Sequence, residues 1–169
     1  MFYNEVMSFT WNLFILAFFA VFTVYGLLLG RNRILGILIN LYPGLVVAEV
    51  AGETVHNFLS HFRVISNNLA TSLFGTKLLL LILVTFLLTI KGEHSKSEVS
   101  GMLSSFQTAL YGFLTAGLLL SSALSFMSES EKLSLFSNSN LANLIASYQI
   151  VWIVAPILCM IGTGFLKKS

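Results

Sequence analysis

Aspartate is absent from this chain of 169 residues, and cysteine occurs once, as Cys159. Without aspartate the chain cannot build the aspartyl dyad with which some proteases hydrolyse peptides inside membranes. A single cysteine cannot form an internal disulfide. Charged residues are also scarce, at 9% of the chain, whereas a soluble domain has roughly a quarter. The composition therefore argues against a soluble globular protein.

Hydrophobic residues make up 56% of the sequence, and they gather in long apolar runs. The net charge of +2 is too small and too scattered for a nucleic-acid-binding surface. At this length the chain forms one domain, residues 1–169. We predict an all-α integral membrane bundle with about five transmembrane helices and one interfacial amphipathic helix, so the lipid bilayer is its first partner.

The apolar runs and the polar segments between them define the predicted elements. A helix rises 1.5 Å per residue and a hydrocarbon core is about 30 Å thick, so each span needs about 20 residues. The predicted interfacial helix, 53–69, places apolar residues at spacings of three and four. Residues 91–100 and 127–140 are polar enough to be aqueous loops. The five predicted spans are residues 11–29, 34–51, 70–90, 109–126 and 141–166.

Residues 34–51 allow two interpretations, because Asn40, Pro43 and Gly44 interrupt this run. Proline removes one helical hydrogen bond and kinks the helix, which membrane helices tolerate when neighbours satisfy the freed backbone. We predict a kinked full span. The alternative is a re-entrant loop, which would reverse the direction of every later segment.

The distribution of basic residues predicts how the chain is threaded. With the N-terminus outside, six basic residues face inward and three face outward, as the positive-inside rule requires. The C-terminus is then cytoplasmic, and the turn at Arg31 and Arg33 lies on the same side. The inward set is Arg31, Arg33, Lys91, Lys96, Lys167 and Lys168, and the outward set is Arg63, Lys77 and Lys132.

Two charged residues, Glu49 and Lys77, lie inside apolar runs. At helical rise both fall at about 20 Å from the inner boundary, so they share one depth. A lone charge at the centre of a membrane helix costs on the order of 3 kcal/mol. Either Glu49 and Lys77 pair with each other in the outer third of the membrane, or each extends independently to the outer surface.

Gly26 and Gly30 form a GxxxG pair at the end of the first span. Such pairs let helix backbones approach closely in lipid, so both glycines are candidates for helix packing.

Candidates for chemistry are few. Glu53 and His56 have the Glu-x-x-His spacing of half a di-metal carboxylate site, and His61 is near in sequence, but the second half is missing. A serine nucleophile would need a base within a span, where no histidine occurs. The chain has no Gly-rich P-loop pattern. We therefore predict no enzyme activity, no metal site and no cofactor.

The segment Gly30-Arg31-Asn32-Arg33-Ile34-Leu35-Gly36 resembles the colicin V production protein family. Those small bacterial inner-membrane proteins have a first helix that ends in a glycine and arginine turn, followed by a glycine-containing second helix. Residues 11–126 would cover the helical core of that family, and residues 141–166 would be an addition. The resemblance implies a non-enzymatic protein of the inner membrane, linked to export and envelope integrity.

Two functions follow as hypotheses. The first is a scaffold or accessory subunit that docks protein partners, or copies of itself, within the membrane. The second is a small transporter or holin-like pore. A pore needs polar residues at successive depths. The candidates for lining it are Asn40, Glu49, Lys77, Ser121, Ser122 and Gln149.

Overall fold

The computed structural model describes residues 2–61, 72–91 and 102–166. Within these ranges the chain forms seven helices and no strand, which confirms the predicted all-α class. Four helices are long and apolar enough to cross a membrane, or five if the bent pair α6 and α7 forms one span. The helices are α1 (Phe2–Leu29), α2 (Arg31–His61), α3 (Leu73–Lys91), α4 (Met102–Phe126), α5 (Glu129–Asn138), α6 (Asn140–Ser147) and α7 (Gln149–Leu166).

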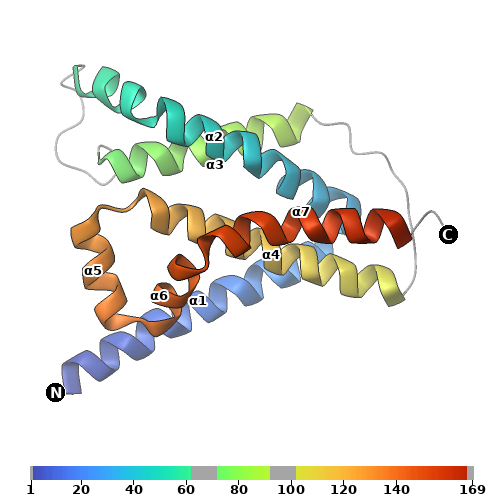
Figure 1. The fold of residues 1–169 in the computed structure, drawn as a ribbon, viewed down its shortest axis with the longest axis horizontal. Coiled ribbons are helices and arrows are strands. Elements are labelled where there is room, and N and C mark those ends of the chain that lie inside the picture. The colour runs from blue at the N-terminus through green and yellow to red at the C-terminus, as the bar shows by residue number, and fades with distance from the viewer. Residues whose placement is uncertain (1, 62–71, 92–101, 167–169) are drawn as a thin grey trace.

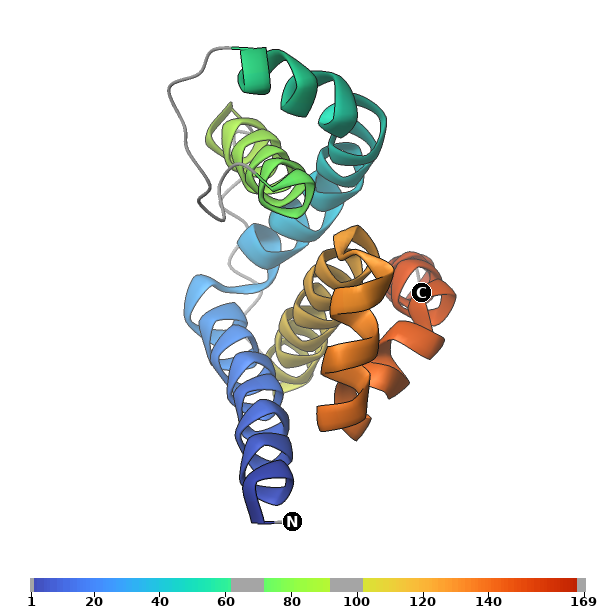
Figure 2. The same ribbon diagram turned by 90° about the vertical axis from the view of Figure 1, so that its left-hand side faces the viewer.

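The long helices run up and down beside one another, with the two chain ends at opposite ends of the molecule (Figure 1). Helix α2 packs mainly on α3, and α1 packs mainly on α4. Figure 2 shows the α2 and α3 pair standing to one side of the group formed by α1 and α4 to α7. The fold thus consists of two helical groups joined through contacts of α2 with α4 and α1.

Helices α1 and α4 approach closely through two glycines. A Cβ placed on Gly26 would lie 3.1 Å from Gly112 Cα, and one on Gly112 would lie 2.7 Å from the Phe22 carbonyl oxygen. Gly26 therefore packs against a helix, as predicted. Gly30 does not. Its φ is 80°, and no atom would lie within 4 Å of its Cβ, so it ends α1 in the left-handed conformation that glycine adopts freely.

Helix α2 removes the predicted boundary between residues 51 and 53. It runs without a break through Pro43 and Glu53 to His61, so residues 34–51 form no re-entrant loop. The predicted separate helix at 53–69 is wrong up to residue 61, because this stretch continues α2, and residues 62–69 lie outside the described ranges. Since the turns either side of Glu53 contain no proline and pack on α3, the backbone has no local cause to leave the helix.

Residues 127–140, predicted as an aqueous loop, contain helix α5 instead. Its start is a capping box: the Ser128 backbone N–H donates to Glu131 Oε2 at 2.9 Å, and the Ser128 hydroxyl donates to the same oxygen. These hydrogen bonds lower the pKa of the exposed Glu131 carboxyl. The stabilisation from this cap is thus present at neutral pH and is lost as the pH falls through the lowered pKa.

The last predicted helix, 141–166, is broken in the structure. Helices α6 and α7 meet at Tyr148 with a bend of 63°. Ser139, which is buried, begins α6: its hydroxyl accepts from the Ala142 N–H and donates to Asn12 Oδ1 on α1 at 2.7 Å. This contact holds the start of α6 against α1. The chain must then bend at Tyr148 before α7 can pack along α4.

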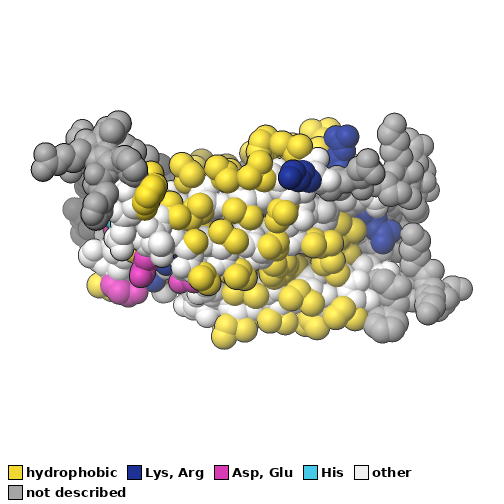
Figure 3. Space-filling view, turned by 90° about the horizontal axis from the view of Figure 1, so that it is seen from above, with side chains coloured by type: hydrophobic (Ala, Val, Ile, Leu, Met, Phe, Trp, Pro, Cys, Tyr) yellow, Lys and Arg dark blue, Asp and Glu magenta, His cyan; other side chains and the backbone are white. Residues whose placement is uncertain are grey.

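The outer surface is largely apolar. Large hydrophobic side chains on α1, α3 and α7 are exposed, including Leu28, Phe86 and Ile150. Figure 3 shows yellow side chains across the middle of the molecule, with basic ones mostly at one end and acidic ones at the other. An exposed apolar surface of this extent is unfavourable in water and favourable in lipid, which indicates a membrane-embedded protein.

Candidate functional site

The interface between α2 and α3 repeats every four residues. The Asn40 Nδ2–H donates to Thr89 Oγ1 at 3.2 Å, one turn further Gly44 lies against Thr85, and Gly52 lies against the stem of Lys77. Each step of four residues along α2 is matched by four residues back along α3. Because residues four apart share a helix face, small residues there let the two backbones approach along their length.

Glu49 and Lys77 form an ion pair in this interface. Lys77 Nζ lies 3.2 Å from Glu49 Oε2, so the predicted contact between the two residues is confirmed. The side chain of Lys77 is 11% exposed and that of Glu49 is 59% exposed. The pair is therefore asymmetric: the ammonium is held inside the bundle, and the carboxylate reaches it from the rim.

Two further contacts fix the position of Lys77, and the adjacent Thr76 makes contacts of its own. Its methylene groups lie against Gly52, where a side chain would displace them. Its Nζ lies 5.6 Å from the centre of the Phe126 ring, a cation–π contact with the end of α4. Thr76, the residue before Lys77, donates its hydroxyl to the Ser72 carbonyl oxygen. The same Oγ1 lies 3.4 Å from His56 Nδ1 on α2. Lys77 therefore connects α2, α3 and α4.

One polar atom in the interface has no partner. Thr85 Oγ1 is buried beside Gly44 and makes no hydrogen bond. Thr89, one turn along, both accepts from Asn40 and donates to the Thr85 carbonyl oxygen at 2.7 Å. An unsatisfied buried hydroxyl costs about 1 to 3 kcal/mol, so the two threonines should respond differently to the same substitution.

Replacement of Thr85 by valine should raise the free energy of unfolding by about 1 kcal/mol, because it removes an unpaired polar atom at nearly constant volume. Thr89→Val is the matched variant. It should lower the free energy of unfolding by about 1 kcal/mol, because Asn40 loses its acceptor. Unfolding of the detergent-solubilised protein, followed by circular dichroism, measures both, and equal effects would contradict the assignment.

The sequence interpretation missed the small residues that make this interface. Gly44, Ala48 and Gly52 repeat every four residues, and Ala48 is fully buried in the core cluster that contains Leu81. This spacing is the same small-xxx-small pattern seen at Gly26 and Gly30, so it was visible in the sequence.

The residues proposed to line a pore separate into two groups. Asn40, Glu49 and Lys77 bond within the α2 and α3 interface. Ser121 and Ser122 both donate to the Leu118 carbonyl oxygen on their own helix. Ser121 also lines a polar pocket of about 260 Å³ between α4, α5, α6 and the start of α7. Its polar members include Ser125, Glu129, Lys132, Asn143 and Gln149.

Tyrosines add polar links between α7 and the rest of the bundle. The Tyr42 hydroxyl donates to the Ile153 carbonyl oxygen at 2.8 Å, in the turn before Pro156. Tyr111 and Thr163 hydroxyls lie 2.5 Å apart. Because a proline weakens the hydrogen bonding of the turn before it, the Tyr42 donor gives that turn an alternative partner.

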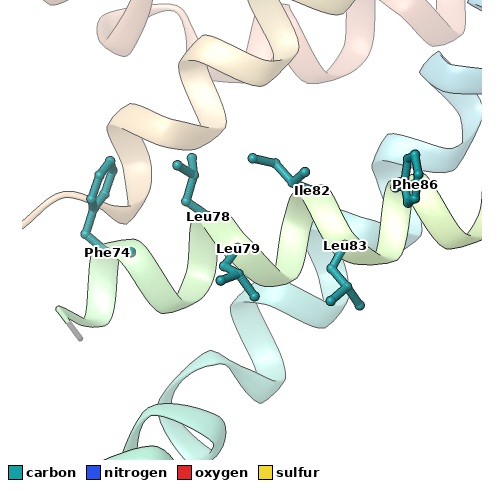
Figure 4. A pocket seen from close by; sticks show the side chains of 7 residues that line it. Phe74, Leu78, Leu79, Ile82, Leu83 and Phe86 are labelled. Carbon is teal, nitrogen blue, oxygen red and sulfur yellow. The ribbon is translucent and has the colours of Figure 1, made fainter. Parts of the chain in front are cut away.

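Helix α3 also borders an apolar groove of about 480 Å³ (Figure 4). Phe74, Leu78, Ile82 and Phe86 recur every four residues and point to one side of the helix, while Leu79 and Leu83 point to the other. The groove has almost no polar lining, so it suits hydrocarbon rather than a polar ligand.

The residues with the spacing of half a di-metal site, Glu53 and His56, do not form a metal site with other described residues. His56 contacts Thr76, Glu53 is exposed, and the side chain of His61 is outside the described part. In the ranges that the structure describes, no three His, Cys, Asp or Glu residues come together as a metal site would require. Arg31 and Arg33 begin α2 at the turn where they were expected.

The contacts described above join α2 to α3, α4 and α7. No protein-family model, no curated protein and no solved structure matches this chain.

Proposed function

We propose that this chain is a multi-pass membrane protein that acts as a non-enzymatic scaffold or accessory subunit of an envelope or export complex. The main support is the way the polar side chains within the long helices are used. Asn40, Lys77 and Tyr42 bond to neighbouring helices, whereas Ser121 and Ser122 bond to their own backbone. Polar groups that already form hydrogen bonds or ion pairs within the bundle are not available to coordinate a passing ion.

The exposed apolar surface supports a role in docking. Helix α3 packs on α2 along one face, and another side of the helix carries the groove bordered by Phe74 and Phe86. Within a membrane such a surface is covered by lipid or by another protein, and a second copy of the chain is one protein that could cover it. A scaffold uses surfaces of this kind.

The cellular placement is part of the proposal. The resemblance at residues 30–36 favours a bacterial inner membrane. The separation of charge supports an external N-terminus and a cytoplasmic C-terminus, because Arg31, Arg33 and Lys91 gather at the end of the bundle where α7 finishes (Figure 1). The positive-inside rule assigns such an end to the cytoplasm.

A small transporter or pore is the second candidate. One observation favours it: the polar pocket lies beside the break between α6 and α7, and broken helices at polar pockets are common in transporters.

Flux through liposomes separates the two functions. Full-length protein is reconstituted into liposomes loaded with potassium and a small fluorescent dye, and release is followed with time. A scaffold should release neither faster than protein-free liposomes do. A known pore-forming peptide in parallel liposomes shows that the assay detects leakage.

Release that rises with protein density, and that changes in a Gln149→Ala variant, would contradict the scaffold proposal and support the pore. Chemical crosslinking in native membranes then tests the scaffold directly, with crosslinkers placed at exposed positions on α3. Crosslinks to many membrane proteins in proportion to their abundance, with none enriched, would count against a specific scaffold.

A further inference from the structure

The end of the bundle where α1 meets α2 carries basic side chains that form no ion pair with another described residue. Arg31 and Arg33 lie in the first turn of α2, Lys91 is the last residue of α3, and these two helix ends lie at the same end of the bundle (Figure 1). Neither of the two ion pairs recorded in the described ranges includes any of these three residues. Those pairs use Lys77 and Lys132 at the opposite end, together with Glu49 and Glu129.

Arg31 is the most informative of the three. Its Nε is buried and has no hydrogen-bond partner. A buried donor on a charged group without an acceptor is costly, and arginine is the side chain best suited to grip a phosphate through several N–H groups at once. Arg31 Nε is therefore a buried donor for which the described residues supply no acceptor.

The backbone beside Arg31 has the same character. Gly30 precedes α2 and has no side chain with which to cap it, and the first turn contains no acidic residue. The first N–H groups of a helix have no acceptor within the helix, and the helix dipole makes that end positive. The start of α2 therefore combines a positive helix end with two arginine side chains in the same turn.

We infer that this basic end binds the phosphate of an anionic phospholipid headgroup through Arg31 and Arg33. The inference rests on the membrane placement proposed above. A lipid is favoured over a soluble phosphate because Leu28, one turn before Arg31, is 80% exposed and belongs to a helix apolar enough to span. An acyl chain can lie along α1 while its phosphate meets the arginines, and Lys91 adds charge nearby.

Lipid retention tests the site. The full chain is purified in mild detergent, phosphatidylglycerol or phosphatidylcholine is added, and bound lipid is counted by native mass spectrometry. The unsubstituted protein should retain phosphatidylglycerol in preference. Each basic residue near an anionic lipid contributes a roughly fivefold change, so the double variant R31Q/R33Q should lose the preference by about tenfold or more.

Two further variants make the assignment specific. Lys132→Gln removes one basic residue at the opposite end and should leave the preference unchanged. Arg31→Lys keeps the charge but removes Nε and the planar fork, and a several-fold loss supports the role of the guanidinium. Retention by Arg31→Lys equal to that of the unsubstituted chain would overturn that role.

Equal retention of the two lipids, or unchanged preference in R31Q/R33Q, would overturn the site. Glycerol 3-phosphate that displaces the lipid at matched concentration would show that the ligand is a soluble phosphate. If the double variant does not fold, the salt dependence of the unsubstituted protein is the test. Its preference for phosphatidylglycerol should decrease as NaCl is raised from about 50 to about 500 mM, and a constant preference rejects the inference. Failure of the protein to float with phosphatidylcholine liposomes would reject the membrane placement itself.

Discussion

Substituting Gly112 by leucine is expected to push α1 and α4 apart. A Cβ at this position would lie 2.7 Å from the Phe22 carbonyl oxygen and 3.1 Å from Thr23 Cα, and these are backbone atoms that cannot move aside cheaply. We expect a loss of about 3 kcal/mol in the free energy of unfolding, the upper part of the range for overpacked sites. For a chain of this size the midpoint of thermal unfolding should fall by roughly 10 °C.

Gly162→Leu is the matched control. It is also a helical glycine, but its Cβ would have no atom within 4 Å. Leucine is a better helix former than glycine, so this variant should gain about 0.5 to 1 kcal/mol. Both variants are compared in the same detergent by circular dichroism. If they behave alike, the close approach of α1 and α4 is wrong.

Lys77→Glu should cause the second large loss. It places a carboxylate where the ammonium lies, beside Glu49 and over the negative face of the Phe126 ring, in a position that is 11% exposed. An uncompensated charge at a mostly buried position costs on the order of 3 kcal/mol or more. Glu49→Gln should cost less than Lys77→Glu, because it leaves the Lys77 ammonium over the Phe126 ring and removes a carboxylate whose side chain is 59% exposed and screened by water.

The reversed pair, Glu49→Lys with Lys77→Glu, should recover part of the stability lost in Lys77→Glu alone. Recovery is incomplete because the cation over Phe126 is not restored. The pair of Lys132 and Glu129 serves as the comparison. The side chain of Glu129 is 86% exposed and that of Lys132 is 22% exposed, so Lys132→Glu should cost less than Lys77→Glu, about 1 kcal/mol. A reversed pair no more stable than Lys77→Glu would show that the two charges are energetically independent.

Local composition was enough to predict the long helices. A run of about 20 apolar residues sets the length of a span through the helical rise alone, and the candidate spans that the structure offers at 11–29 and 73–91 lie close to those predicted. The contact of Glu49 with Lys77 was also within reach, because the same rise gives the depth of each residue.

The positions that sequence reasoning missed depend on contacts far along the chain. Residues 141–166 contain a break at Tyr148 that neither proline nor glycine marks, and the contact of Ser139 with Asn12 explains it only once α1 and α6 are side by side. The change in hydropathy at residue 53 likewise predicted a separate surface helix. In the structure, residues 53–61 continue α2, which packs on α3.

The sequence by itself determined that most of this protein consists of apolar helices of membrane-spanning length, because hydropathy and helical rise are properties of single residues and short segments. Only the tertiary structure decided which helices are neighbours, which glycines permit close approach, and why Lys77 is buried beside Phe126. These features depend on the register between helices, and the register is fixed by side chains that meet across the bundle.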